Sequence, residues 1–384
     1  MGEWKEYKLR DITSKITSGG TPKSSEANYY DGNIPWLNTK EVNFNRIART
    51  EKCITEEGLN NSSAKWIPKG SVIIAMYGAT AAKVAYSLID LTTNQACCNL
   101  IIDIDIADSQ FVYYYIQSSY EELLNLACGA AQQNLSVGVI ADFPILLPPL
   151  AEQKHIASIL TSLDDKIDLL HSENATLEAM AETLFRQWFI EEAKEDWKEI
   201  SLTKVANFLN GLACQKYPPK NEIEKLPVLK IRELSNGIGD DSDWATTDIT
   251  SEYIIHAGDV IFAWSASLMV KIWDGEDCIL NQHLFKVTSY KYPKWFYYLW
   301  CKHHLNEFIA IAQSHATTMG HIKRSDLESA IVLIPSNKEL MMMNEQMDGM
   351  LRKIENNNRQ LQTLIKVRNG LLPKLINREI SIYG

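Results

Sequence analysis

The chain repeats itself along its length, and this repeat limits the folds open to it. Trp4-Lys5-Glu6 recurs as Trp197-Lys198-Glu199, and residues 68–75 recur as residues 256–263. From residue 94 onward the copies lie 187 residues apart, because Asn94-Gln95 falls on Asn281-Gln282 and Leu147-Pro148 on Ile334-Pro335. A constant offset through several matches indicates a duplication, so each half should form one structural unit.

Each copy changes character partway along. Residues 71–75 and 99–102 are β-branched runs bounded by turn residues, which predicts strands. The aromatic run 111–116 and its counterpart 295–300 are predicted to be helical or mixed. These patterns predict a mixed α/β domain of about 145 residues in each copy. After Pro148-Pro149 no Pro or Gly occurs until past residue 190, which favours a long helix.

Both predicted helices carry a heptad, because apolar residues recur at alternating spacings of four and three. The alternative is a helix packed only on its own domain, but two equivalent stripes favour mutual packing. A polar residue in such a seam can fix register, and we expect this role for one Asn in each helix. The predicted coiled-coil seam contains Ile156, Leu160, Leu163, Ile167, Leu170, Asn174, Leu177, Leu184, Met347, Met350, Ile354, Asn357, Leu361, Leu364 and Leu371.

The repeat divides the chain into a first domain (1–149), a central helical spacer (150–193), a second domain (194–335) and a C-terminal helical spacer (336–384). The central spacer has a net charge of -6 and the C-terminal spacer +3, which suits packing of the two helices against each other. The whole chain has a net charge of -10, which argues mildly against a nucleic-acid binder. Only one face of each domain needs to be positive, so this objection is limited.

Common catalytic motifs are missing from the sequence. It has no phosphate loop, no dinucleotide-binding glycine motif, no G-x-S-x-G elbow and no metal-ligand spacing, so a binding protein is favoured over an enzyme with an unrecognised site. Seven scattered cysteines, with no signal segment and no long apolar stretch, indicate reduced thiols in a cytoplasmic protein. We expect no metal and no cofactor in this chain.

Several segments together resemble the specificity subunit of type I restriction-modification systems. The start, with Gly19-Gly20-Thr21-Pro22, looks like the beginning of a target-recognition domain. The segments 132–136 and 145–153, the latter with Pro-Pro-Leu-Ala-Glu-Gln, resemble the family's junction between domain and helix. Residues 317–327 are similar to this junction in variant form. Residues 335–339 depart from the pattern, which leaves the start of the second helix open.

The resemblance implies an α+β fold, with two target-recognition domains in pseudo-two-fold arrangement joined and followed by long helices that form an antiparallel coiled coil. Each domain would read one half of a bipartite target in double-stranded DNA, and the helices would set the distance between half-sites. Two methyltransferase (M) subunits would bring S-adenosylmethionine, and restriction (R) subunits would bring ATP and Mg. The complex would be a site-specific deoxyribonuclease and adenine-N6 methyltransferase, with target adenines flipped into the partner's pocket.

Candidate DNA contacts come from polar and basic loops, because Gln and Asn suit adenine and Arg and Lys suit guanine. In the first domain they are Thr21, Lys23, Ser24, Lys40, Tyr77, Thr80, Lys83, Gln132, Gln133 and Asn134. In the second they are Lys216, Lys230, Arg232, Ser265, Ser267, Lys271, Thr317, Thr318, His321, Lys323 and Arg324. For a single loop Lys, a solvated surface residue is the alternative. Asn94-Gln95 and Asn281-Gln282 are either turn amides or DNA contacts.

Two other functions are also compatible with the sequence. The first is a specificity subunit of a type II-like or stand-alone adenine methyltransferase. The second is a purely structural coiled-coil scaffold, against which the polar, glycine-punctuated loops argue. Because the loops differ between the copies, we expect an asymmetric target, and weak DNA binding by this chain without its partners.

Overall fold

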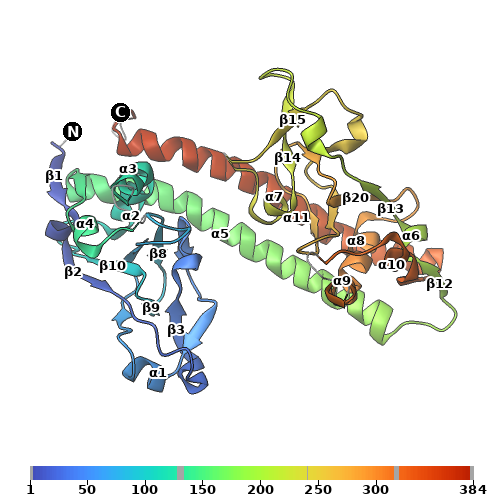
Figure 1. Cartoon of the computed structure of the whole chain (residues 1–384), viewed down its shortest axis with the longest axis horizontal. Coiled ribbons are helices and arrows are strands. Elements are labelled where there is room, and N and C mark those ends of the chain that lie inside the picture. The colour runs from blue at the N-terminus through green and yellow to red at the C-terminus, as the bar shows by residue number, and fades with distance from the viewer. Residues whose placement is uncertain (1–2, 128–133, 240, 315–319, 381–384) are drawn as a thin grey trace. The chain divides into compact units, whose positions relative to one another are not determined.

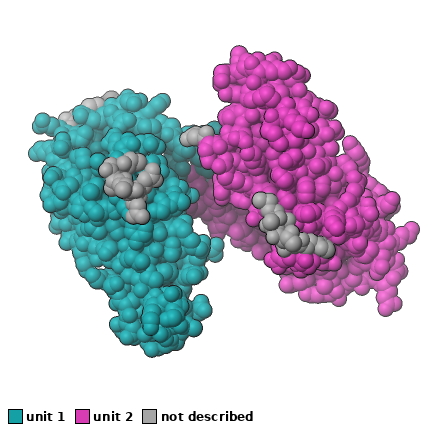
Figure 2. Space-filling model, in the orientation of Figure 1, with its two compact units in different colours: residues 1–166, 364–384 teal, residues 167–363 magenta. Residues whose placement is uncertain are grey.

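The computed structural model describes residues 3–127, 134–239, 241–314 and 320–380 (Figure 1). The chain forms two compact units: unit 1 contains Met1–Lys166 and Leu364–Gly384, and unit 2 contains Ile167–Thr363 (Figure 2). Both limits fall inside long helices, α5 (Leu150–Arg186) and α11 (Asn337–Ile376). Each unit therefore combines the α/β domain of one copy with helical residues of both copies.

Unit 1 is built on small sheets covered by helices. Its strands are β1 (Lys5–Lys8), β2 (Thr13–Ser18), β3 (Tyr30–Leu37), β4 (Asn45–Ile47), β5 (Lys52–Ile54), β6 (Trp66–Ile67), β7 (Val72–Ala75), β8 (Val84–Ser87), β9 (Leu91–Thr93), β10 (Cys97–Ile102) and β11 (Pro144–Leu147). Its shorter helices are α1 (Glu56–Asn60), α2 (Ser109–Ser118), α3 (Tyr120–Ala127) and α4 (Val137–Ala141). The sheets have the orders β2-β10-β7-β8-β4, β5-β3-β9-β6 and β1-β11, and β3 runs parallel to β9.

Unit 2 repeats this topology closely. Its strands are β12 (Lys198–Ser201), β13 (Asn207–Asn210), β14 (Lys225–Leu229), β15 (Trp244–Thr246), β16 (Ile254–Ile255), β17 (Val260–Ala263), β18 (Met269–Ile272), β19 (Cys278–Leu280), β20 (Leu284–Thr288) and β21 (Ile331–Ile334). Its shorter helices are α6 (Leu202–Val205), α7 (Ile231–Asn236), α8 (Lys294–His303), α9 (Leu305–Ser314) and α10 (Arg324–Ser329). The orders β13-β20-β17-β18, β15-β14-β19-β16 and β12-β21 correspond to those of unit 1 without β4, and β14 runs parallel to β19.

The repeated sequence elements have repeated structural roles. Gly70 and Gly258 have φ values of 89° and 95°, a conformation that favours glycine, and each lies in the turn before the central strand β7 or β17. The predicted strands at 71–75 and 99–102 correspond to β7 and β10. The aromatic run 111–116 is helical, in α2, as is its counterpart in α8. Most side chains of both runs are buried.

The repeated tryptophans anchor the starts of the long helices. Trp4 Nε1 donates a hydrogen bond to Glu152 Oε1 at 3.3 Å, and Trp197 Nε1 donates to Glu339 Oε2 at 3.1 Å. Ser336 and Glu339 also form a capping box, since the Ser336 backbone N–H donates to Glu339 Oε2 at 2.9 Å and the Glu339 N–H donates to Ser336 Oγ at 3.4 Å. The cap fixes the start of the second helix at Asn337, which the sequence left open.

The predicted seam residues lie on the inner faces of α5 and α11. Those that are buried are Ile156, Leu160, Ile167, Leu170, Asn174, Met347, Ile354, Asn357 and Leu361, and those that are partly buried are Leu163, Leu177, Leu184, Met350, Leu364 and Leu371. In unit 2, Asn357 Nδ2 donates to Asn174 Oδ1 at 2.9 Å. In unit 1, Arg368 Nη1 lies 3.0 Å from Asp164 Oδ1. The helices therefore pair with each other in antiparallel sense within each unit.

The ends of the helices also pack on the α/β domains, as the alternative interpretation held. Ile156 and Leu160 share the core of unit 1 with Leu372, Leu375 and Ile376 near the end of α11. The heptad missed these last three residues because they face the domain core and not α5 alone. In unit 2, Ala181, Phe185, Met347 and Leu351 join a core rich in Trp and Phe.

Candidate nucleic-acid interface

One pair of predicted contact residues comes together at the same place in each unit. In unit 1, Tyr77 forms an isolated antiparallel bridge with Asn134, and in unit 2, Ser265 forms the equivalent bridge with His321. The backbone hydrogen bond from Leu135 to Met76 (2.7 Å) and that from Ile322 to Trp264 (3.1 Å) extend the two bridges. The bridges thus hold two polar loops side by side at the end of β7 or β17.

The predicted contacts Gln132, Gln133, Thr317 and Thr318 lie outside the described residues. In the sequence they come one to four residues before the bridge residues Asn134 and His321. Their participation in an interface stays a prediction.

Around the bridge of unit 1, predicted contact residues form a polar edge. Thr21 Oγ1 donates to Gln95 Oε1, which connects the glycine-rich loop to the turn before β10. Tyr77 is 37% exposed although its ring is largely apolar, so it can stack on a base or sugar. Asn134 is also exposed and presents an amide of the kind that reads adenine.

Other predicted residues of unit 1 are engaged within the protein. Thr80 Oγ1 donates to the Thr39 carbonyl at 2.9 Å, and Lys83 Nζ donates to Asn43 Oδ1 at 2.7 Å. Lys40 pairs with Glu51 at 2.5 Å, and this hydrogen bond raises the pKa of Lys40. Lys23 pairs with Glu26 at 3.3 Å, while Ser24 is exposed. Surface ion pairs are weak, so the Lys23 and Lys40 side chains are free to exchange these carboxylates for DNA phosphates.

The equivalent edge of unit 2 has different chemistry. The ring of Trp264 lies 5.9 Å from that of His283 and 6.3 Å from that of His321. Ser265 Oγ lies 3.1 Å from His283 Nδ1, so the bridge joins a hydroxyl, two imidazoles and an indole. No sequence pattern indicated this cluster, because its rings come from three separated segments.

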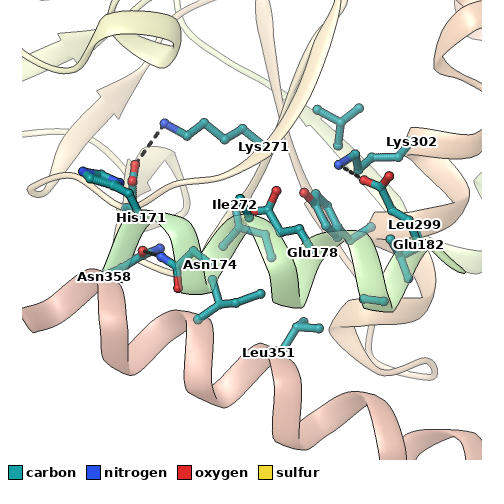
Figure 3. A pocket seen from close by; sticks show the side chains of 16 residues that line it. His171, Asn174, Glu178, Glu182, Lys271, Ile272, Leu299, Lys302, Leu351 and Asn358 are labelled. Carbon is teal, nitrogen blue, oxygen red and sulfur yellow. Dashed lines mark hydrogen bonds and ion pairs between the residues drawn. The ribbon is translucent and has the colours of Figure 1, made fainter. Parts of the chain in front are cut away.

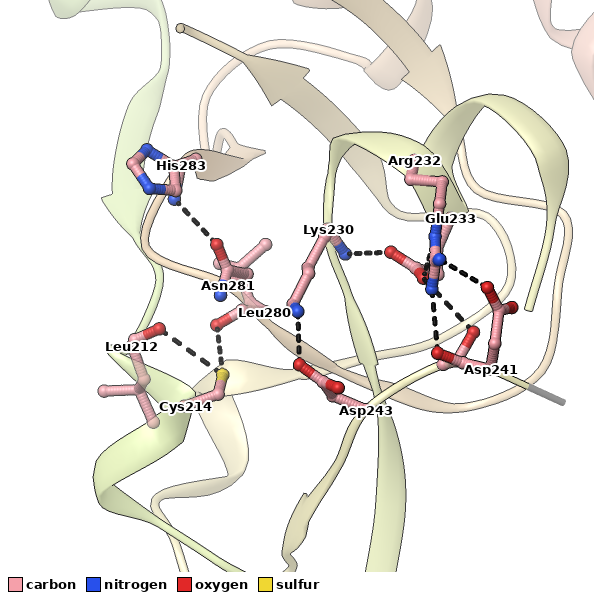
Figure 4. Close-up of polar contacts among 11 residues, drawn as sticks. Leu212, Cys214, Lys230, Arg232, Glu233, Asp241, Asp243, Leu280, Asn281 and His283 are labelled. Atoms are coloured by element: carbon pink, nitrogen blue, oxygen red, sulfur yellow. Dashed lines mark hydrogen bonds and ion pairs between the residues drawn. The ribbon is translucent and has the colours of Figure 1, made fainter. Parts of the chain in front are cut away.

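Lys230 and Arg232 are held by carboxylates of their own domain (Figure 4). Lys230 Nζ pairs with Asp243, and this contact lowers the pKa of Asp243. Arg232 Nη2 lies 2.6 Å from the Oε1 of Glu233, a carboxylate that is 1% exposed, and its Nη1 lies 2.5 Å from Asp241 Oδ2. A buried carboxylate requires a counter-charge, so Arg232 has a structural role whether or not it also meets DNA.

Lys271 lies away from the bridge loops, on the wall of a cavity of about 410 Å³ between β18, α8 and the two long helices (Figure 3). It pairs with Asp274 at 3.1 Å. The remaining candidates of unit 2, namely Lys216, Ser267, Lys323 and Arg324, are exposed. The last two lie at the start of α10, shortly after the bridge residue His321.

The Asn of each repeated Asn-Gln pair is buried in a turn. Asn94 is buried and its Oδ1 accepts from the Ala96 backbone at 3.2 Å, and Asn281 is buried with its Oδ1 accepting from the His283 backbone at 3.3 Å. Both are therefore turn amides. Gln95 is exposed at the edge of unit 1, so for this residue a DNA contact stays a prediction.

Comparison with known proteins identifies the duplicated domain. The profile described as "Type I restriction modification DNA specificity domain" matches residues 1–179 and again residues 194–366. The chain belongs to this family. It is a DNA specificity subunit, the part of a type I restriction-modification enzyme that selects the sequence and does not carry the catalytic centres.

Relatives of this specificity subunit cover nearly its whole length. It is 26% identical to the type I restriction enzyme MjaIX specificity subunit of Methanocaldococcus jannaschii, over 99% of this chain and 94% of the relative. It is 23% identical to the EcoKI specificity subunit of Escherichia coli, over 99% and 88%. The crystal structure of the type I S subunit from M. genitalium has the same fold, with a TM-score of 0.57 and 15% identity over 97% of this chain and 96% of that one.

The described residues of the specificity subunit contain neither a metal-binding cluster nor a helix suited to a membrane. Within residues 3–127, 134–239, 241–314 and 320–380, no group of three or more His, Cys, Asp or Glu side chains could hold a metal ion. In the same ranges, no helix combines the length and apolar character needed to cross a membrane. The cysteines described, Cys53, Cys97, Cys98, Cys214, Cys278 and Cys301, are unpaired, and burial raises the pKa of the Cys214 thiol to about 11.

Proposed function

We propose that this specificity subunit reads a bipartite, asymmetric DNA sequence, with residues 1–149 reading one half-site and residues 194–335 the other. One observation supports the asymmetry. The same bridge carries Tyr77 and Asn134 in the first domain but Ser265 and His321 in the second. Ser265 is only 7% exposed, so the exposed groups are a phenol and an amide in the first domain and an imidazole in the second. Different exposed donors and acceptors at one position of a shared fold select different base edges.

The helical spacers, residues 150–193 and 336–384, complete the proposal as the scaffold for two methyltransferase subunits and the restriction subunits. S-adenosylmethionine, ATP and Mg bind to those partners in this proposal, and the assembly works on double-stranded DNA in the cytoplasm. The partners also supply phosphate contacts, because this chain has a net charge of -10 and phosphate binding favours basic surfaces.

To test this proposal, the DNA sequence that the subunit recognises is first determined by sequencing the host's methylome, which gives the modified motif. Asn134→Ala and His321→Ala are then compared in the assembled methyltransferase on duplexes with single substitutions in either half-site. Each variant should lose about tenfold or more in affinity and relax discrimination in one half-site only. Lys338→Ala, at an exposed position near the start of α11, is the matched control. Loss of discrimination in both half-sites from either variant would contradict the assignment.

A further inference from the structure

The two long helices are copies of each other. Each could therefore pair either with the other helix of its own chain or with the same helix of a second chain. In this chain α5 pairs with α11, but α5 resembles α11 closely enough that α5 of a second chain could take its place. The offset of 187 residues makes Leu170 equivalent to Asn357, Asn174 to Leu361, Asp164 to Leu351 and Ala181 to Arg368. At these four positions a polar residue in one copy replaces an apolar residue in the other.

In unit 2, the observed pairing places a polar residue opposite a polar residue at the two Asn positions. Asn357 Nδ2 donates to Asn174 Oδ1 at 2.9 Å and also to Glu173 Oε2 at 2.9 Å. Asn174 Nδ2 donates to Asn358 Oδ1 at 2.6 Å. Asn357 is fully buried and Asn174 is 9% exposed. One turn away, the antiparallel register brings Leu170 opposite Leu361, and both are buried.

The same rule holds at the charged positions. In unit 1, Asp164 is 4% exposed, and its Oδ1 lies 3.0 Å from Arg368 Nη1 while Tyr114 Oη donates to its Oδ2 at 2.7 Å. The equivalent positions Leu351 and Ala181 are both buried in the core of unit 2. A charge therefore meets its counter-charge, and an apolar side chain meets another.

Pairing of α5 with a second α5, or of α11 with a second α11, would place a polar residue opposite an apolar one at each of these positions. In the same register, α5 against a second α5 would place Asn174 opposite Leu170 and Asp164 opposite Ala181. Two α11 helices would place Asn357 opposite Leu361 and Arg368 opposite Leu351. A buried amide or charge without a partner is costly, so pairing of like helices is disfavoured at each of these positions.

We propose that Asn174, Asn357, Asp164 and Arg368 select the helix partner: they favour pairing of α5 with α11 and disfavour self-association of the subunit through α5 with α5 or α11 with α11. A polar residue in a seam is known to choose register and oligomeric state in this way. Partner choice is measured on the free protein and is therefore independent of DNA reading.

The test uses the full-length chain refolded from denaturant, with mass from light scattering over a concentration series and thermal midpoints. Asn174→Leu should raise the self-association constant by about tenfold or more and lower the midpoint, because the new leucine would face Asn357 within the chain and Leu170 in a like pair. Asn174→Leu with Asn357→Leu should restore the midpoint to or above the wild-type value and keep the raised self-association, because every pairing is then Leu against Leu.

A polar counterpart separates partner choice from the apolar character of the seam. Leu170→Asn with Leu361→Asn places Asn opposite Asn in every pairing, so self-association should rise relative to the wild type although the seam is less apolar. Unchanged self-association in Asn174→Leu and in both double variants would overturn the proposal. A midpoint of the Leu double variant below that of Asn174→Leu would also overturn it, and this outcome is readable even if the Asn double variant fails to fold.

Discussion

Where α5 and α11 meet the α/β domains, unit 1 holds Asp164 and Arg368, with Tyr114 donating to the carboxylate. The equivalent place in unit 2 holds Leu351 and Ala181, next to a cluster of aromatic rings. The strand orders of the two units correspond. The fold therefore accepts either chemistry, but with different consequences: an apolar contact tolerates many partners, whereas a buried charge tolerates only its counter-charge.

The largest expected effect follows from breaking the ion pair of unit 1. Arg368→Ala leaves Asp164 buried without its counter-charge, although Tyr114 still donates to it, and the free energy of unfolding measured with denaturant should fall by about 3–5 kcal/mol. Asp164→Leu with Arg368→Ala transplants the apolar pair of unit 2 and should recover most of this loss. A loss below about 1 kcal/mol in the single variant would show that the two junctions are energetically alike.

A second difference concerns the basic residues that follow the bridge. Lys323 and Arg324 lie at the start of α10, whereas the equivalent Ser136 caps α4 and is followed by Val137. Lys323→Ala with Arg324→Ala should weaken target binding by the assembled methyltransferase about tenfold and reduce the slope of log affinity against log salt by about 1–2. Val137→Ala should leave the slope unchanged. An unchanged slope in the double variant would remove both residues from the interface.

The smallest expected effect concerns Glu339, which caps the start of α11 in unit 2. Hydrogen bonds from Lys194 and Ser336 lower the pKa of Glu339 to about 2. Because this folded pKa lies below the ordinary value of 4.5, the stabilisation is fully present above about pH 4.5 and is lost as the pH falls toward 2. Glu339→Gln should cost about 1 kcal/mol or less at neutral pH and weaken the acid dependence of unfolding between these values. Equal acid dependence in variant and wild type would contradict this assignment.

The sequence predicted what depends on periodicity and repetition. The duplication, the central strands, the long helices and the seam through Leu170 and Leu361 all follow from patterns within one segment. Contacts between distant segments did not follow. Arg232 pairs with Asp241 across a loop, and the rings of His283 and His321 both lie near that of Trp264. These contacts depend on the conformations of turns, which are hard to predict from a single sequence.

The core of unit 1 includes Leu372, Leu375 and Ile376, which the ribosome adds more than 200 residues after the rest of that core. The first recognition domain therefore cannot close its core during its own synthesis, and it leaves part of its apolar surface uncovered until translation is nearly finished. A message truncated anywhere before this last stretch yields a chain whose first domain stays incomplete. The last helix thus couples completion of the first domain's core to the end of chain synthesis.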